Sequence, residues 1–418
     1  MPDSFYADNP GYSRGLVART IRKTFLSLRN RNFRLFFIGQ SISNTGNWLT
    51  NVALILLVLK LTGSGFAVGL LAACQFGPIL FLSAWAGAIA DRRDKRQMLF
   101  WTQSLEMAQS AALAVLAFMP HPPVIGLYIL AIVGGVLLSF DNPLRRSFVT
   151  DMVPPEDIPN AVVLYSTIIN ASRIFGPALA GLLVVTLGYG WAFALDAASY
   201  LAVIYCLYIM IPDELHRHPP RPRSKDEVRE GLRYIATMPI LWISFVMLAA
   251  IGTLAYNFSV TFPLFVTDAL HSSNTVFTII YSVFSFGAVT SAMLVAHRGL
   301  VQIRHIIFGA GLLGIAMLVF AFTGGVWEAG IVVFFVGMAS ILYMTSTTAI
   351  IQVEAKREMH GRLLALQTVF IAGTALIGGP LSGWLADVLG GRSPIILGGI
   401  VCLASAIFGY IATRRYVH

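Results

Sequence analysis

Apolar residues fill most of the chain in long runs that short polar segments interrupt. Each run holds roughly 20 residues or more, and a helix rising about 1.5 Å per residue then spans the ~30 Å hydrocarbon layer of a bilayer. The pattern therefore predicts an all-α membrane protein with twelve transmembrane helices. The expected helices cover residues 33–60, 66–90, 97–118, 124–148, 160–186, 191–211, 240–266, 275–296, 303–322, 326–350, 361–388 and 394–413.

The longest polar stretch, residues 212–234, separates the sixth apolar run from the seventh. It is rich in proline at first and is then patterned like a short amphipathic helix. We expect a solvated linker between two bundles of six helices each. The predicted organisation is a basic cytoplasmic arm (1–32), a first bundle (33–211), a linker (212–239), a second bundle (240–413) and a cytoplasmic tail (414–418).

Composition supports the membrane assignment and narrows the partners. The 418 residues are 56% hydrophobic and 12% charged, too few charges for the surface of a soluble protein of this size. The net charge of +9 would suggest nucleic acid in a soluble protein, but the positions of the cations indicate lipid headgroups, so no nucleic-acid partner is expected. Cys74, Cys206 and Cys402 lie unpaired in apolar runs, as is typical of buried cysteines rather than of a metal site.

The positive charges fall almost entirely on one side of the predicted topology. If the N-terminus is cytoplasmic, all of the 29 Lys and Arg residues except Lys60, Arg173 and Arg392 lie in or beside cytoplasmic segments. Cytoplasmic loops carry the excess of Lys and Arg in membrane proteins. The distribution predicts a multi-pass protein of the inner (plasma) membrane with both termini in the cytoplasm.

A short motif recurs about half a chain apart. FGPALAGLL begins at Phe175 and GGPLSGWLA begins at Gly378, and the loops before them, VPPEDIPNA and AKREMHGRL, fall in register. Duplicated six-helix halves are typical of secondary transporters, which bind substrate near the membrane midplane between the repeats. The repeat therefore predicts two pseudo-symmetric bundles.

The loop GAIADRRDKRQML lies between the second and third expected helices. A glycine at Gly87 allows another helix to approach closely, and Asp91 can pair with cations or with the N-terminus of a neighbouring helix. The loop resembles the signature loop of the major facilitator superfamily, which usually has glycine where this chain has Asp94. The resemblance implies a gating latch between two rocking bundles, and the alternative is a plain positively charged loop. The matching residues are Gly87, Asp91, Arg92, Lys95 and Arg96.

Longer segments resemble one branch of that superfamily, the bacterial drug and siderophore exporters related to the enterobactin exporter. They are FDNPLRRSFVTDMVPPEDIPNAV, the NASRIFGPALAG that follows, and NFRLFFIGQSISNTGNWLTNVALILLVLKLTGS near the start. The resemblance covers nearly the whole chain and is strongest in the first half. In proton-coupled exporters of the superfamily a Gly-Pro motif in the fifth helix marks the antiport direction, and Gly176, Pro177 and Gly181 match it loosely. The resemblance implies that this helix closes the outer side when the inner side is open.

Arg173 lies near the middle of the fifth expected helix, roughly 20 Å from either end. A cation at that depth costs ~2.5–3.5 kcal/mol on insertion scales, so it should face the bundle interior or a wet cavity and meet an anion. The intramembrane candidates are Glu106, Asp141 and Asp196. We predict proton coupling through Glu106, Asp141 and Arg173, with a static ion pair as the alternative for Arg173 and Glu106. The resemblance associates Asp141 with an inner-gate network that includes Arg92 and Lys95.

Four amide side chains of the first expected helix share one face, because their spacing is four, three and four residues. They are Gln40, Asn44, Asn47 and Asn51. Amides facing lipid are costly, so we expect them to line a substrate cavity, with a helix–helix seam as the alternative. Trp48 beside them could stack on an aromatic ligand, and Tyr256, Asn257 and Tyr343 would complete an amphipathic pocket.

The basic arm, residues 14–34, predicts a helix that lies on anionic lipid, and a disordered basic tail is the alternative. Its apolar residues at helical spacing oppose its cations. The apolar set is Ile21, Phe25 and Leu28, and the basic set is Arg22, Lys23 and Arg29.

With the resemblance, these features indicate a monomeric transporter of the facilitator fold, without cofactor or metal, that exports amphipathic small molecules such as drugs or siderophore-like compounds in exchange for protons. Two alternatives remain open: a proton-coupled or passive importer of a polar nutrient, and a receptor or scaffold that transports nothing. An enzyme is disfavoured because the sequence has no HExxH, GxSxG or Cys/His cluster.

Overall fold

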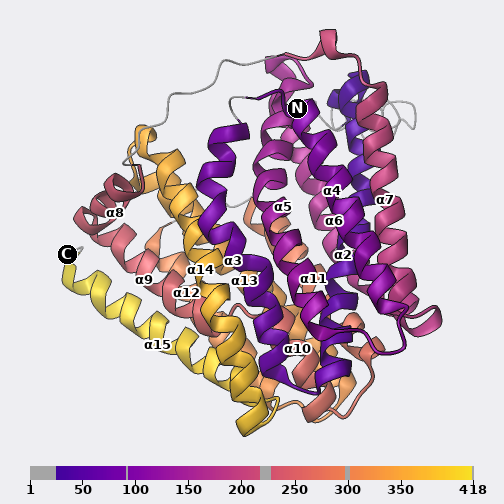
Figure 1. Ribbon diagram of the computed structural model, residues 1–418. Helices are drawn as coiled ribbons and strands as arrows, with labels where there is room; N and C mark the ends of the chain where they lie inside the picture. Colours follow the sequence, from indigo (N-terminus) through magenta and orange to yellow (C-terminus); the bar gives the residue numbers. More distant parts are fainter. Residues whose placement is uncertain (1–24, 91–92, 217–226, 297–301, 417–418) are drawn as a thin grey trace, which may run out of the picture.

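The computed structural model describes residues 25–90, 93–216, 227–296 and 302–416, and all regular structure in them is helical (Figure 1). The first half begins with the 3-10 turn η1 (Leu26–Arg29) and holds six long helices joined by short loops. These are α2 (Arg31–Thr62), α3 (Gly65–Ala90), α4 (Lys95–Ala117), α5 (Val124–Asp151), α6 (Ile158–Thr186) and α7 (Tyr189–Ile209), with the 3-10 turns η2 (Pro155–Asp157) and η3 (Pro212–Glu214).

The second half follows the short helix α8 (Glu227–Thr237). Its first span is broken into α9, α10 and a π-helical turn, η4, which together run from Pro239 to Ala269. The elements are α9 (Pro239–Leu254), α10 (Phe258–Leu264), η4 (Phe265–Ala269), α11 (Asn274–Ala296), α12 (Ile303–Ala321), α13 (Val326–Glu354), α14 (Arg357–Leu389) and α15 (Ser393–Tyr416).

Within the described residues, 11 of these spans are long and apolar enough to cross a membrane. The remaining long helix, α4, spans 23 residues but carries Gln103, Glu106 and Gln109 along its middle. Its length and its place in the bundle make it the twelfth crossing, so its polar face must be covered by protein. The predicted twelve-helix membrane fold is confirmed.

The two halves pack as separate bundles that meet along two helix pairs (Figure 1). In the first half α2 packs on α6 and α7, and in the second half α11 packs on α13 while α12 packs on α15. Between the halves, α3 contacts α14 and α6 contacts α11. Helices α3 and α11 are each the second helix of their bundle, and α6 and α14 are each the fifth. Both pairs therefore join the second helix of one half to the fifth helix of the other half. The interface therefore has the pseudo-symmetry that the sequence repeat predicts.

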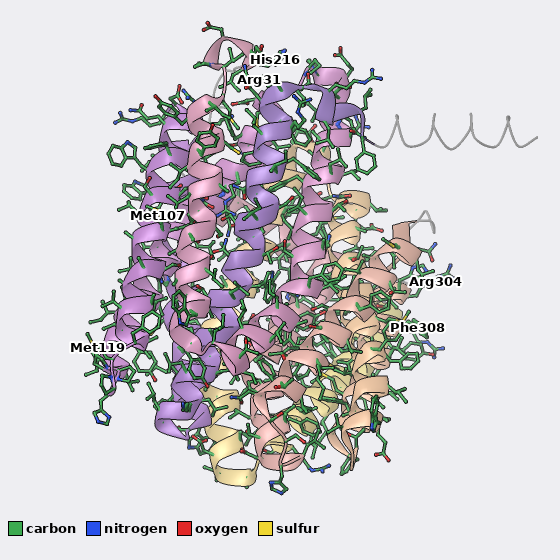
Figure 2. All side chains as sticks on the ribbon, turned by 90° about the vertical axis from the view of Figure 1, so that its right-hand side faces the viewer. Arg31, Met107, Met119, His216, Arg304 and Phe308 are labelled. Atoms are coloured by element: carbon green, nitrogen blue, oxygen red, sulfur yellow. The ribbon has the colours of Figure 1, made fainter. Side chains whose placement is uncertain are left out.

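The two ends of the bundle differ in charge. In Figure 2, Arg31 and His216 lie at one end, which we call the basic face, and Met119 lies at the other, the opposite face. Of the two cations expected at the opposite face, Lys60 lies 5.3 Å from the centre of the Tyr189 ring. Arg392 donates to the carbonyl of Ala321 at 2.6 Å, at the end of a helix where a cation complements the dipole.

The linker and the arm are described in part. Helix α8 confirms the amphipathic helix expected there, and it is held to α14 by an ion pair between Glu230 and Arg362. The Tyr234 hydroxyl also accepts a hydrogen bond from the Lys356 backbone N–H at 3.2 Å. Most of the predicted arm helix, with Ile21, Arg22 and Lys23, lies outside the described residues.

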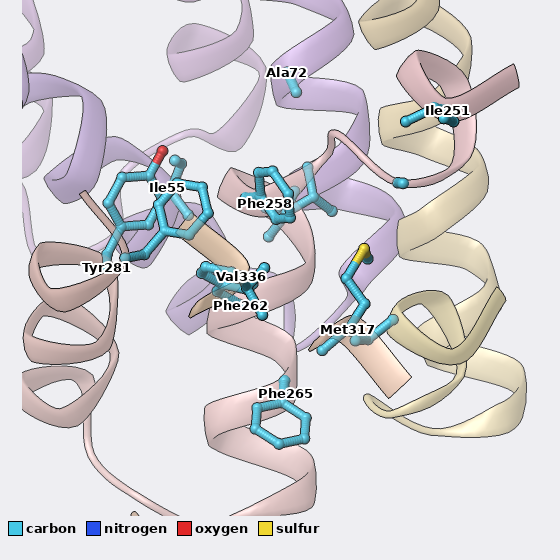
Figure 3. Packing of buried hydrophobic residues seen from close by; sticks show 14 of the residues in the cluster. Ile55, Ala72, Ile251, Phe258, Phe262, Phe265, Tyr281, Met317 and Val336 are labelled. Atoms are coloured by element: carbon cyan, nitrogen blue, oxygen red, sulfur yellow. The ribbon is translucent and has the colours of Figure 1, made fainter. Parts of the chain in front are cut away.

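The middle of the second half is a core of aromatic rings. The rings of Phe258 and Phe284 lie 4.7 Å apart, and those of Phe265 and Phe320 lie 4.6 Å apart. Figure 3 shows Phe258, Phe262 and Phe265 following one another down the same segment of chain. The middle of the first half is polar by contrast, and this difference locates the candidate site.

Candidate functional site

A cluster of three charged side chains lies inside the first half. Glu106 comes from α4, and Asp141 and Arg145 come from α5; they are 4%, 0% and 3% exposed. Asp141 and Arg145 are four residues apart on one helix and form an ion pair. The Nη2 atom of Arg145 lies 3.2 Å from Oε2 of Glu106. One guanidinium therefore holds two buried carboxylates.

Neutral side chains complete the cluster. The Gln103 amide donates to both carboxylates, at 3.0 Å to Glu106 and 2.7 Å to Asp141. Arg145 donates to Gln40 Oε1 at 3.0 Å, and Asn44 Oδ1 lies 3.5 Å from the same nitrogen. The amide stripe predicted on α2 thus contributes two of its members to the charge cluster rather than to an open wall.

A third buried carboxylate lies nearby on α7. Asp196 is 0% exposed and accepts hydrogen bonds from the hydroxyls of Thr50 and Ser110, both at 2.6 Å. Among the described residues, no cation lies within ion-pair distance of it. Apart from Asp151, which pairs with Lys95, the described part of the first half therefore buries three carboxylates, and two of them bond the guanidinium of Arg145.

The expectation that Arg173 would pair with one of these carboxylates is wrong. Its guanidinium meets no described carboxylate, and its Nε is buried without a hydrogen-bond partner. Arg145 takes the anions instead, because it lies one helical turn from Asp141, whereas Arg173 lies within electrostatic reach of Tyr256 and Tyr281 in the second half.

The inner-gate network expected for Asp141 is also corrected. Lys95 pairs with Asp151 at 2.8 Å, and Arg96 donates to the carbonyls of Leu207 and Tyr208 at the end of α7. Helix α5 continues to Asp151, which brings that carboxylate, and not Asp141, to the start of α4.

The remaining residues of the signature loop are placed only in part. Asp94 caps α4 by accepting from the Gln97 N–H at 3.0 Å, which gives this aspartate a role that glycine lacks. Gly87 is buried in the last turn of α3. Asp91 and Arg92 lie outside the described residues.

The predicted substrate residues divide into accessible and buried sets. Asn47, Trp48, Asn51 and Tyr256 keep partial exposure. Asn47 also accepts from the Tyr200 hydroxyl at 2.6 Å.

Asn257 and Tyr343 are buried, and Tyr343 is 0% exposed. The pocket wall predicted for these two is therefore wrong in this conformation. Tyr343 packs beside Tyr256 at the aromatic core, and Asn257 donates to the carbonyl of Thr253 at 2.7 Å.

The predicted glycines of α6 lie at contacts with other helices. A Cβ added at Gly181 would come 2.7 Å from Cβ of Thr278 on α11, and one added at Gly176 would come 2.7 Å from Cγ of Trp48 on α2. Pro177 is buried inside α6, which continues unbroken to Thr186. Gly181 thus allows the two halves to approach closely.

The second seam, between α3 and α14, closes at the opposite face. A Cβ at Gly65 would lie 2.7 Å from the carbonyl oxygen of Gly383. Asp387 at the end of α14 accepts from the N–H groups of Gly65 (2.5 Å) and Phe66 (2.9 Å), and from the Ser64 hydroxyl at 2.7 Å. One carboxylate of the second half therefore caps the N-terminus of a first-half helix.

Three of these residues were missed from the sequence. Arg145 was counted among the cations of a cytoplasmic segment, although its spacing from Asp141 already indicated an ion pair on one helix. Asp196 was considered only as a partner for Arg173. The residues around Asp387 in the sequence do not indicate its role, because that role depends on the packing of two helices from different halves.

Comparisons with known proteins agree with this architecture. The family described as transmembrane secretion effector matches residues 22–416. The staphyloferrin A transporter of Staphylococcus aureus is 26% identical, with 91% of this chain and 96% of the relative covered. Macrolide efflux protein A of Streptococcus pyogenes is 24% identical (89% and 94% covered), and the enterobactin exporter of Citrobacter koseri is 22% identical (85% and 86%).

Solved structures share the fold at lower identity. An inward-facing bacterial homologue of the human lysosomal transporter Spinster aligns with a TM-score of 0.73 at 14% identity, covering 92% of this chain and 97% of that one. The peptide-transporter-family protein PepTSo aligns with a TM-score of 0.75 at 12% identity, covering 93% and 98%. The chain is thus a multi-pass membrane transporter and not an enzyme, and it belongs to the transmembrane secretion effector family of the major facilitator superfamily.

Proposed function

We propose that this transporter exports amphipathic small molecules in exchange for protons, with its basic face in the cytoplasm of a bacterial cell. The observation that carries the proposal is the surplus of buried carboxylates around Arg145. With Glu106 and Asp141 both ionised, the cluster holds two negative charges and one positive charge away from water. Uncompensated charge in such surroundings is costly, and binding one proton removes the surplus.

The cluster is connected to the face that substrate would contact. Arg145 also donates to Gln40, and Asn44 bonds Gln40 through its side chain at 3.1 Å. Asn47, Trp48 and Asn51 follow on the same helix, α2, and are partly exposed. A proton that changes the bonding of Arg145 therefore acts on the helix that carries the candidate binding residues, which is the coupling that exchange requires.

The contacts between the halves support alternating access. Asp387, Gly65 and Gly181 all lie toward the opposite face and hold the halves together there. We assign this conformation to a state closed on the outer side. Rocking of the halves would separate both seams and open that side.

The relatives support export. One is named as an enterobactin exporter and another as a macrolide efflux protein. Identity to these proteins is low, so the substrate of this chain is inferred from its own site.

Uptake into everted membrane vesicles tests the proposal. The probes are fluorescent amphipathic dyes of positive, zero and negative charge, and the vesicle lumen is acidified by respiration. We expect at least one dye to accumulate, collapse of the uptake by an uncoupler, and loss of it in Glu106→Gln and Asp141→Asn. Glu328→Gln, which alters an exposed carboxylate at the opposite face, is the matched control. Uptake only into right-side-out vesicles would identify an importer, and unchanged behaviour of all variants would favour a scaffold.

A further inference from the structure

Arg173 is a cation in the middle of a membrane helix without a protein counter-ion. Glu106 and Asp141 are bonded to Arg145, and Asp196 is bonded to hydroxyls on α2 and α4. The guanidinium of Arg173 meets no carboxylate among the described residues, and its Nε has no hydrogen-bond partner. An unpaired charge at this depth costs free energy that a bound anion would recover.

The surroundings of Arg173 come from both halves. Tyr256, at the break between α9 and α10, and Tyr281 on α11 are the second-half groups within electrostatic reach. Trp48 of α2 contacts α6 at Gly176, one turn beyond Arg173, and its ring lies 5.9 Å from the Tyr281 ring. Figure 3 shows the Tyr281 hydroxyl at the edge of the aromatic core. The cation thus lies near the junction of the halves, one helical turn from the Trp48 contact.

Three side chains at this junction are partly exposed. Arg173, Trp48 and Tyr256 are of intermediate exposure, whereas Tyr281 is 7% exposed. The protein therefore does not fully enclose the guanidinium or the Trp48 ring.

The chemistry of these groups defines a ligand. A guanidinium presents a planar fork of N–H donors that matches a carboxylate, and it remains charged at any working pH. Aromatic rings contact an apolar or aromatic body at little conformational cost. Resting on the proposed export function, we propose that Arg173 binds the anionic group of the substrate, and that the substrate is an amphipathic molecule carrying a carboxylate, with Trp48, Tyr256 and Tyr281 contacting its apolar part.

The sequence predicts a role for Arg173 in proton coupling, together with Glu106 and Asp141, and the proposed role in substrate binding replaces that prediction. Proton exchange belongs to Glu106 and Asp141, which have their own arginine, and substrate charge belongs to Arg173. Because the two arginines share no described partner, a change at Arg173 should leave the Arg145 cluster intact.

Calorimetric binding of two matched probes to the purified full-length protein tests the proposal. The probes are 2-naphthoate and its neutral amide, 2-naphthamide, in an uncharged detergent. A charge-assisted pair should make the wild type bind the carboxylate about tenfold or more tightly than the amide. Arg173→Gln should abolish the preference, and Arg173→Lys should keep part of it because the charge remains. Arg146→Gln, which alters an exposed arginine of α5, should leave the preference unchanged.

Equal affinity of the wild type for both probes, or an undiminished preference in Arg173→Gln, would overturn the proposal. If Arg173→Gln does not fold, Arg173→Lys and the wild-type comparison still decide the question. The assay contains no proton gradient, so it is independent of export. If the protein prefers the carboxylate probe but everted vesicles take up no dye, proton-driven export is rejected and the anion site stands. If the vesicles take up dye but the protein shows no carboxylate preference, the anion site is rejected and export stands.

Discussion

Arg145 organises the polar interior of the first half. It pairs with Asp141 and Glu106 and donates to Gln40, so side chains from α2, α4 and α5 depend on one guanidinium. Removing one partner from a buried ion pair leaves an uncompensated charge, which costs more than the pair itself contributes. The cluster therefore specifies how these helices pack, and it holds the groups that we propose exchange a proton.

Substitution of Arg145 should destabilise the protein strongly as long as Glu106 and Asp141 keep their carboxylates. Arg145→Gln is expected to lower the free energy of unfolding by about 3–5 kcal/mol, because two carboxylates lose their cation. Adding Glu106→Gln and Asp141→Asn should recover most of the loss. Thermal unfolding in detergent measures both effects, and Arg146→Gln is the control. Strictly additive losses across the triple variant would contradict a shared cluster.

The polar stripe of α2 shows how far the sequence alone could lead. The spacing of the stripe predicts that its amides avoid lipid, because that requirement is local, and Gln40, Asn44 and Asn47 do bond polar side chains of other helices. Their partners could not be predicted, since Arg145 and Tyr200 approach from other helices. The same limit explains why Arg173 received the wrong counter-ion. Depth in the membrane follows from position along a helix, whereas the facing side chain follows from packing.

Helices α6 and α14 hold corresponding places in the two bundles and close the interface with α11 and α3. Each uses small residues where the backbones approach, as at Gly181 against Thr278 and at Gly383 against Gly65. The repeated glycine motif of the sequence therefore marks the two seams between the halves. The cap that Asp387 places on α3 adds a charged contact to the α3–α14 seam.

A larger side chain at Gly181 should prop the α6–α11 seam open. Gly181→Val would clash with Thr278, so we expect the opposite face to become accessible and transport to fall. The opening is measured by the rate at which a membrane-impermeant thiol reagent labels a cysteine introduced at Thr278 of α11. The rate is compared between the variant with Gly181 intact and the variant that also carries Gly181→Val. Gly330→Ala, at an open position on α13, should change nothing. Equal labelling with glycine and with valine at Gly181 would contradict the assignment.

Loss of the Asp387 cap should weaken the closed outer side without unfolding the protein. Asp387→Asn keeps the size of the side chain but removes the charge that complements the start of α3, an effect of about 0.3–1 kcal/mol. We expect faster thiol labelling of a cysteine at Val68, which is 1% exposed, than in the same cysteine variant with Asp387 intact. Asp213→Asn, at the basic face, provides the control. Unchanged labelling would show that the cap does not hold this seam.

The two bundles share a fold but divide the chemistry unequally. The first half buries Glu106, Asp141, Asp196 and Arg145 in its middle, and the second half fills its own middle with aromatic rings. Arg173 belongs to the first half and faces the second. In the proposed mechanism one bundle binds the protons and the substrate binds between both bundles. Exchange then requires that protonation of the cluster alter how the halves sit together.

Pulsed electron-spin distance measurements test this central claim most directly. The native cysteines Cys74, Cys206 and Cys402 are first replaced. One pair of spin labels, at Arg93 and Arg357, then measures the distance between the halves at the basic face. A second pair, at Thr62 and Leu389, measures it at the opposite face, and all four positions are exposed. As the pH falls from neutral to mildly acidic, we expect the two distances to change in opposite directions. A Glu106→Gln, Asp141→Asn double variant should be insensitive to the change. Distances that ignore pH in the wild type, or that shift equally in the double variant, would contradict coupling through this cluster.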